Sequence, residues 1–218
     1  MQKITALEPQ QRNPQRVNLY LDGEFACGLS RIVAGWLSLG QEISADKLAS
    51  LQSQDEAEVV FQKALHFLSF RPRSCAEVRT NLLRRGIQAE LADEVLERLK
   101  QSGLLNDQAF AQAWVENRTT FRPRSRTALR AELRRKGISE ELIQSTLDGQ
   151  VEEEALALEA ARRQARRYAG LDRPDFRKKL GEYLARRGFS YTILAPVVSQ
   201  VWEESQTADA RGKPEQEE

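Results

Sequence analysis

Two periodicities of hydrophobic residues divide the chain. In residues 16–28 (RVNLYLDGEFACG), Val17, Leu19 and Leu21 alternate with polar or aromatic neighbours, and Phe25 and Cys27 recur with the same period after the pair Asp22-Gly23. Alternation with a period of two predicts β-strands. An Asp-Gly pair between two such strands predicts a hairpin, because a type I′ turn needs positive φ at both central residues. Residues 4–7 are expected to add a third strand. We therefore predict a small β-hairpin module over residues 1–54.

From residue 55 onward, apolar residues recur every three or four positions, which predicts helices. Three segments, residues 70–87, 121–138 and 172–189, align without gaps at a constant spacing of 51 residues. Each has a proline near its start, a leucine in its middle and a glycine near its end. The shared positions are Pro72, Pro123 and Pro174, then Leu82, Leu133 and Leu184, then Gly86, Gly137 and Gly188. A repeat of this length is one supersecondary unit copied in tandem, and its copies stack side by side.

Each copy is expected to fold as three short helices. The residue before a proline is pushed out of the α region, so the Arg-Pro pair ends the first helix. Ser74 followed by Glu77 predicts a capping box for the second helix, and Gly86 suits a helix end in the left-handed region. The predicted fold is mainly α, an elongated tandem array of three three-helix repeats that resemble helix-turn-helix units. The predicted boundaries are residues 1–54 for the hairpin module, 55–103, 104–150 and 151–204 for the repeats, and 205–218 for a disordered acidic tail.

Large aromatic side chains are expected to serve packing. Trp36, Trp114 and Trp202 are predicted to lie in the core rather than to stack on bases. Phe70 and Phe121 directly precede the Arg-Pro pairs, and we expect them to pack between repeats rather than to stack on nucleotides.

Charge is strongly segregated along the chain, although the formal net charge is only +1. Residues 71–85 hold five basic residues and one acid, residues 122–136 hold seven and one, and residues 162–187 hold ten and three. Residues 140–154 hold six acids and no base. Patches of this kind steer partners even when the total charge is close to zero.

The arginines of the second helices predict contact with DNA phosphates. Arg126, Arg130 and Arg134 are spaced by four, so they line one face of a helix. A guanidinium donates two hydrogen bonds to a phosphate, and binding of this kind weakens steeply with salt. The predicted DNA-binding residues are Arg71, Arg73, Arg79, Arg122, Arg124, Arg126, Arg130, Arg134, Arg162, Arg163, Arg166, Arg167, Lys178, Lys179 and Arg186. The alternative explanation is that acidic third helices pair with these residues, or that they complement helix dipoles.

No pattern typical of catalysis is found in the sequence, and no enzymatic activity, cofactor or metal site is expected. The single histidine, His66, falls on a predicted helix and is expected at its surface or in the core. Cys27 and Cys75 are too few for a disulfide framework, so both are expected to be reduced thiols. No apolar run reaches the roughly 20 residues of a membrane span, and no signal pattern opens the chain. We expect a soluble, cytoplasmic protein.

Three stretches together resemble the RecX family of recombination regulators. They are residues 64–83 (ALHFLSFRPRSCAEVRTNLL), 103–115 (GLLNDQAFAQAWV) and 122–138 (RPRSRTALRAELRRKGI). The resemblance covers residues 55–202, and the hairpin module lies outside it. The sequence departs from the family pattern at Asn106, where aspartate is frequent, at Ser125, where glycine is common, and at Cys75. Asparagine and serine can both cap a helix, so the first two departures preserve the local structure.

The resemblance implies a regulator of RecA, the recombinase that forms filaments on single-stranded DNA. Family members are taken to lie in the filament groove, to bind DNA, and to suppress ATP hydrolysis, strand exchange and filament growth in DNA repair and recombination. The implied partners are the RecA filament and single- and double-stranded DNA, with no membrane, and a monomer is expected. We expect basic faces to meet DNA, and Glu140 and Glu141 to meet the recombinase.

Two other classes of protein fit parts of the pattern. A helix-turn-helix transcription regulator usually reads bases with amide or arginine side chains at the start of one recognition helix, and usually as a dimer. The basic stretches here are repeated, rich in arginine and poor in amides, which favours phosphate contact. A helical scaffold that binds only proteins is the third possibility, and it would have no affinity for DNA even at low salt.

Overall fold

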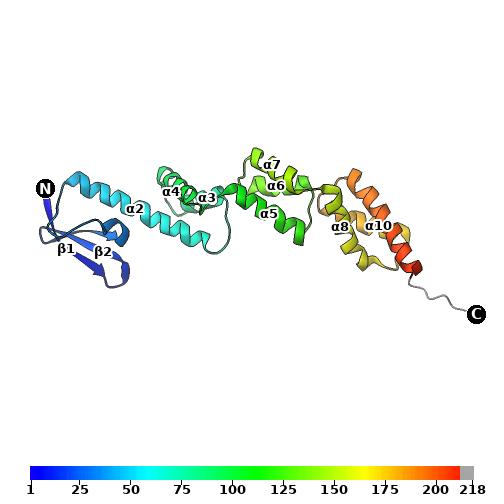
Figure 1. The fold of residues 1–218 in the computed structure, drawn as a ribbon, viewed down its shortest axis with the longest axis horizontal. Coiled ribbons are helices and arrows are strands. Elements are labelled where there is room, and N and C mark those ends of the chain that lie inside the picture. The colour runs from blue at the N-terminus through cyan, green and yellow to red at the C-terminus, as the bar shows by residue number, and fades with distance from the viewer. Residues whose placement is uncertain (212–218) are drawn as a thin grey trace, which may run out of the picture. The chain divides into compact units, whose positions relative to one another are not determined.

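The computed structural model describes residues 1–211, with side chains through Thr207. These residues fold into two compact units that divide after Leu105. The first unit holds a strand module and the first three-helix repeat, and the second unit holds the other two repeats; Figure 1 shows the elements of each. No helix within residues 1–211 combines the length and apolar character needed to cross a membrane.

The strand module is an antiparallel sheet with the order β3-β2-β1-β4. Its elements are β1 (Gln2–Gln10), β2 (Asn13–Leu21), β3 (Glu24–Ser30), the short helix α1 (Arg31–Ala34) and β4 (Glu42–Ile43). Asp22 and Gly23 both have positive φ, 51° and 89°, which confirms the predicted hairpin turn. Leu19 and Leu29 are fully buried between the sheet and the helix that follows. The predicted third strand is present and is longer than expected.

Helix α2 (Ala45–Leu68) begins ten residues earlier than the helical pattern predicted, because Ser44 caps it. The Ser44 hydroxyl accepts a hydrogen bond from the backbone of Lys47 at 3.2 Å, and Leu51 packs into the core of the strand module. One continuous helix therefore serves both the module and the first repeat, and the predicted boundary at residue 54 falls inside it.

Asp55 of α2 is buried and ties the helix to the sheet. Its two carboxylate oxygens accept hydrogen bonds from the Arg16 guanidinium at 2.7 Å and from the backbone N–H of Ser30 at 2.5 Å. A charge buried in this way is stable only when it is paired and hydrogen-bonded. The carboxylate thus fixes the N-terminal module against α2.

The first repeat is completed by α3 (Cys75–Arg84) and α4 (Ala89–Gln101), which pack on α2 through a core that includes Leu82 and Leu99. The predicted capping box is present: the Ser74 hydroxyl accepts from the backbone of Glu77 at 3.2 Å, and the Glu77 carboxylate accepts from the backbone of Ser74 at 3.3 Å. Gly86 ends α3 with a φ of 80°, as expected. Neither cysteine forms a disulfide.

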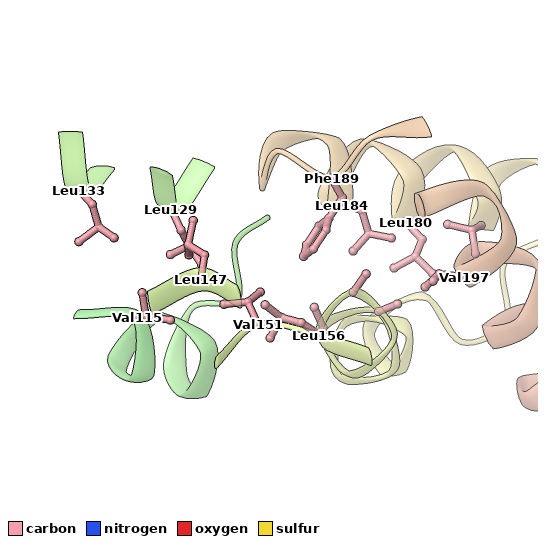
Figure 2. Packing of buried hydrophobic residues seen from close by; sticks show 14 of the residues in the cluster. Val115, Leu129, Leu133, Leu147, Val151, Leu156, Leu180, Leu184, Phe189 and Val197 are labelled. Carbon is pink, nitrogen blue, oxygen red and sulfur yellow. The ribbon is translucent and has the colours of Figure 1, made fainter. Parts of the chain in front are cut away.

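The second unit contains two repeats that share one hydrophobic core. Its elements are α5 (Asp107–Phe121), α6 (Arg126–Arg135), α7 (Glu140–Gln150), α8 (Glu153–Ala165), the 3-10 turn η1 (Arg166–Tyr168), α9 (Arg173–Arg186) and α10 (Tyr191–Arg211). Figure 2 shows Leu129 and Leu147 of the second repeat in the same cluster as Leu156 and Leu184 of the third. The two repeats are therefore joined by continuous apolar packing.

The junction between these two repeats depends on a glycine. The backbone N–H of Ser125, at the start of α6, donates to the carbonyl of Arg187 at the end of α9, at 3.0 Å. Gly188 follows with a φ of 90°, and a Cβ atom at this position would lie 2.6 Å from the Ser125 hydroxyl oxygen and 3.0 Å from Ala128 Cβ. Both the backbone conformation and the close approach exclude a side chain here.

Three of the aromatic predictions are wrong. Trp36 is 90% exposed, because smaller aliphatic side chains already fill the core of the strand module. Phe70 and Phe121 are 69% and 72% exposed, because each stands where its helix gives way to the Arg-Pro segment. Trp114 and Trp202 do pack against the core of the second unit, as predicted.

The predicted tail also starts later than expected. Helix α10 continues to Arg211, so residues 205–211 are helical, and the rest of the predicted disordered tail lies outside the described residues. The Arg162 guanidinium of α8 donates to both carboxylate oxygens of Glu204, at 2.8 and 2.6 Å. This pair holds the end of α10 against α8, which the acidic composition alone could not reveal.

Replacing Gly188 by alanine is expected to destabilise the second unit by roughly 2–5 kcal/mol, from the cost of positive φ and of overpacking. The matched control is Gly170→Ala in the same unit. Gly170 also has positive φ, 81°, but no neighbouring atom within 4 Å, so about 1–2 kcal/mol is expected there. Urea unfolding followed by tryptophan fluorescence measures both values. Equal losses for the two variants would contradict the proposed close approach.

Candidate nucleic-acid interface

The predicted arginine row of α6 lies against the acidic helix α7. Arg126 pairs with Asp148, and it also donates to the carbonyl of Val151 at 3.2 Å. Arg130 forms an ion pair with Glu140 at 3.1 Å and donates to Gln144, and Arg134 donates to Glu140 at 2.7 Å. The three arginines do share one face, as their spacing predicts, but that face is occupied by α7.

The same contacts lower the pKa of Glu140 and of Asp148, two of the three carboxylates on α7. The hydrogen bond from Arg134 lowers the pKa of Glu140, and the Arg130 charge adds to the effect. Hydrogen bonds from Gln144 and Arg126 lower the pKa of Asp148. Both groups are therefore ionised partners of α6. Glu140 pairs with arginines of its own repeat. Glu141 is exposed and has no side-chain partner within the described part of the chain.

Glu132 forms a second network on the other side of α6. Its side chain is only 11% exposed. It accepts hydrogen bonds from Trp114 Nε1 at 2.9 Å and from Arg118 at 2.8 Å, and it forms an ion pair with Arg124 at 3.1 Å. Burial alone would raise the pKa of Glu132, but the hydrogen bonds from Arg118 and Trp114 outweigh it and leave the pKa lowered. Arg124, a predicted DNA ligand, is thus part of the support for α5 and α6.

The predicted arginines of the first repeat also have partners within the repeat. Arg71 pairs with Glu77 at 2.9 Å, and Arg79 of α3 pairs with Asp93 of α4 at 2.6 Å. The hydrogen bond from Arg79 lowers the pKa of Asp93. Arg73 lies over the ring of Phe67, 3.8 Å from its centroid.

Three of the predicted residues in the third repeat, Arg162, Arg163 and Arg186, also have acidic partners. Arg162 holds Glu204, as described above. Arg163 pairs with Glu159 and donates to the carbonyl of Thr120 at 2.9 Å, and Arg186 lies 3.7 Å from Glu182.

Five of the predicted residues are exposed and have no side-chain partner among the described residues. They are Arg122, Arg166, Arg167, Lys178 and Lys179. Four of the five belong to η1 and α9 in the third repeat. Arg173 and Arg177 of α9 are not among the predicted residues, yet they share these properties and line a cavity of about 410 Å³.

Two signals in the sequence could have identified this part of the third repeat. Arg173 occupies the same repeat position as Arg71 and Arg122. In addition, α7 carries acids that face α6, whereas residues 191–202 of α10 contain no acid. Residues 191–202 of α10 therefore supply no carboxylate to α9, and Arg173, Arg177, Lys178 and Lys179 have no side-chain partner among the described residues.

The fold defines a class of protein, one built from three tandem three-helix repeats behind a small strand module. Family models of RecX match each of these parts. They are the RecX N-terminal domain over residues 2–44 and the first, second and third three-helix domains over residues 61–99, 106–147 and 152–194. This chain belongs to the RecX family of regulatory proteins.

Individual relatives agree with the family match. The regulatory protein RecX of Halalkalibacterium halodurans is 31% identical over 209 residues, which is 91% of this chain and 77% of that protein. That of Streptomyces coelicolor is 41% identical over 154 residues, 69% of this chain and 81% of that protein.

Solved structures confirm the predicted fold class, mainly helical with three three-helix domains and an N-terminal strand module. A crystal structure of regulatory protein RecX superposes with a TM-score of 0.73 at 25% identity, and covers 90% of this chain and 98% of that one. RecX from Lactobacillus salivarius shares the fold with a TM-score of 0.60 at 22% identity, over 68% of this chain and 97% of that one.

The Glu132 network makes a prediction about pH. Because the folded protein lowers the pKa of Glu132, its charged form stabilises the fold above the ordinary glutamate pKa of about 4.3. That stability is lost as pH falls through the lowered value. Glu132→Gln is expected to cost about 1–3 kcal/mol at pH 7. The difference from the unsubstituted protein should shrink as the pH drops below about 4.

Urea unfolding at a series of pH values measures this difference. Glu141→Gln is the matched control, because Glu141 is exposed and only the dipole of α7 acts on its charge, so its loss should stay below about 1 kcal/mol. A loss in Glu132→Gln that does not depend on pH would mean that the carboxylate charge is not what stabilises the network.

Proposed function

We propose that this protein binds RecA filaments and DNA, and that it limits ATP hydrolysis, strand exchange and filament growth during DNA repair and recombination. Membership of the RecX family supports this role, because the relatives are named as regulatory proteins. The protein acts by binding, through DNA contacts on its basic surface and protein contacts elsewhere. Such a role is carried out in the cytoplasm, where the recombinase meets DNA.

The observation that carries the DNA part of the proposal is the set of unpaired cations on η1 and α9. A phosphate that meets Lys178 or Lys179 displaces only water and counterions. A phosphate that meets Arg130 must compete with Glu140. Exposed ion pairs are worth only about 0–1 kcal/mol each, so this competition is possible but unfavourable. We therefore place the primary DNA contacts in the third repeat.

The remaining predicted arginines have a secondary role in this proposal. Those of α6 reach DNA only when their partners on α7 release them, and Arg124 mainly supports the fold through Glu132. For the recombinase we propose that the acidic first turn of α7 makes contact chiefly through Glu141. Glu140 contributes there only if it leaves Arg134.

The double variant Lys178→Ala with Lys179→Ala is expected to weaken binding to single-stranded DNA several-fold without unfolding the protein, because both side chains are exposed. The slope of log affinity against log salt should fall by roughly 0.7 for each lost phosphate contact. Fluorescence anisotropy with a labelled oligonucleotide at several salt concentrations measures both quantities.

The matched control is Arg12→Ala with Lys47→Ala, which removes the same charge from exposed positions of the first unit. If the control lowers the slope as much as the α9 variant does, net charge rather than local contact explains the effect, and α9 is not the interface.

The proposed effect on the recombinase is tested by measuring the rate of ATP hydrolysis by RecA. We expect substoichiometric amounts of the protein to slow hydrolysis by RecA on single-stranded DNA, because one bound molecule can arrest the growth of a filament made of many subunits. The assay is run with DNA in excess, so that simple capture of DNA by the protein cannot lower the rate. Unchanged hydrolysis at an equimolar ratio would contradict the proposal.

A further inference from the structure

A cavity of about 590 Å³ lies within the first unit, where the strand module meets α2 and the end of α3. Four cations line it. Arg16 is paired with Asp55, and the other three come from three different elements: Arg31 at the start of α1, Lys63 of α2 and Arg85 at the end of α3. These residues lie far apart in the sequence, and they are brought together by the docking of α2 on the sheet and of α3 on α2. The cavity belongs to a different unit from the cations of α9.

The carboxylates around the cavity already have partners. Asp55 is held by Arg16 at 2.7 Å, and Glu58 accepts from Arg98 at 2.7 Å and from Gln62 at 2.8 Å. Arg31, Lys63 and Arg85 are exposed and have no side-chain partner within residues 1–207. Like charges that converge on one concave site, without a neighbouring free acid, make a field that attracts an anion.

The rest of the lining suits a ligand that is not a simple ion. Amide side chains of Asn13, Gln15 and Gln62 supply neutral hydrogen-bond donors and acceptors. Ile32 and Val59 add an apolar surface on which a flat ring can rest. The volume falls in the range of about 300–1,000 Å³ that is usual for small-ligand sites. Cations, amides and an apolar wall together match a phosphate joined to a sugar and a base.

We propose that this cavity binds a nucleoside phosphate, either as one nucleotide of a DNA strand or as a free nucleotide. The cations would hold the phosphate, the amides would meet the sugar or the base edge, and the base would lie on Ile32 and Val59. The proposal gives the N-terminal module a binding role, because it supplies Arg31 and Ile32, and it does not depend on the recombinase.

The test uses the double variant Lys63→Gln with Arg85→Gln in the full-length protein. Its matched control is Lys47→Gln with Arg84→Gln, because these residues are exposed on the same two helices but do not line the cavity. Amide NMR shifts of Ile32 and Val59 are followed during titration with dTMP and, separately, with a (dT)8 oligonucleotide. Arg31→Gln provides an independent variant should the double variant be unstable.

Shifts at Ile32 and Val59 with both probes would support a site that accepts a free nucleotide, and shifts with the oligonucleotide alone would identify a DNA strand as the source. In either case the cavity variants should weaken binding at least about tenfold, since each lost charged hydrogen bond is worth roughly 1.5–3 kcal/mol. The control should bind as the unsubstituted protein does.

The proposal is overturned if neither probe shifts these amides, or if the cavity variants and the control bind equally. Such a result would leave the proposed recombinase function standing, because ATP hydrolysis and the α9 variant are measured separately.

Discussion

The arginines of α6 and the carboxylates of α7 meet because the two helices bury their apolar sides in one core. Leu129 and Leu133 of α6 and Leu147 of α7 lie in the same cluster, which leaves the charged edges of both helices side by side. Opposite charges on these adjacent edges form ion pairs. Each ion pair occupies a cation that could otherwise bind another molecule. The acid content of the neighbouring helix therefore decides how much of a basic helix can bind an external anion.

The three repeats obey this constraint with different results, although their folds are alike. In the first two repeats, carboxylates of the third helix form ion pairs with arginines of the second helix, as in Arg79–Asp93 and Arg134–Glu140. In the third repeat, the first turns of α10 make apolar contacts with α8 and α9. The cations of α9 face solvent. The three-helix plan is thus common to the repeats, whereas the pairing of their charges differs.

The attachment of the N-terminal module to the first repeat likewise depends on paired charges, here at a single carboxylate. Asp55 on α2 neutralises Arg16 and holds the backbone at Ser30, which places the strand module firmly against the first repeat. Arg16 is paired in this way, whereas the nearby Arg31, Lys63 and Arg85 have no carboxylate partner within the part of the chain that the structure describes. The contact that builds the first unit thus also shapes its cavity.

Local sequence determined much of this protein. The Asp22-Gly23 turn, the Ser74 capping box, the glycine helix ends and the repeat itself depend on neighbours within a few residues or on a fixed period, so they can be read from the chain. The start of α2, the exposure of Trp36, Phe70 and Phe121, and the extension of α10 depended on contacts between distant segments. The charged sites were also decided by tertiary structure. A row of arginines looks the same in the sequence whether or not a carboxylate from another helix faces it, and only packing brings that carboxylate within reach.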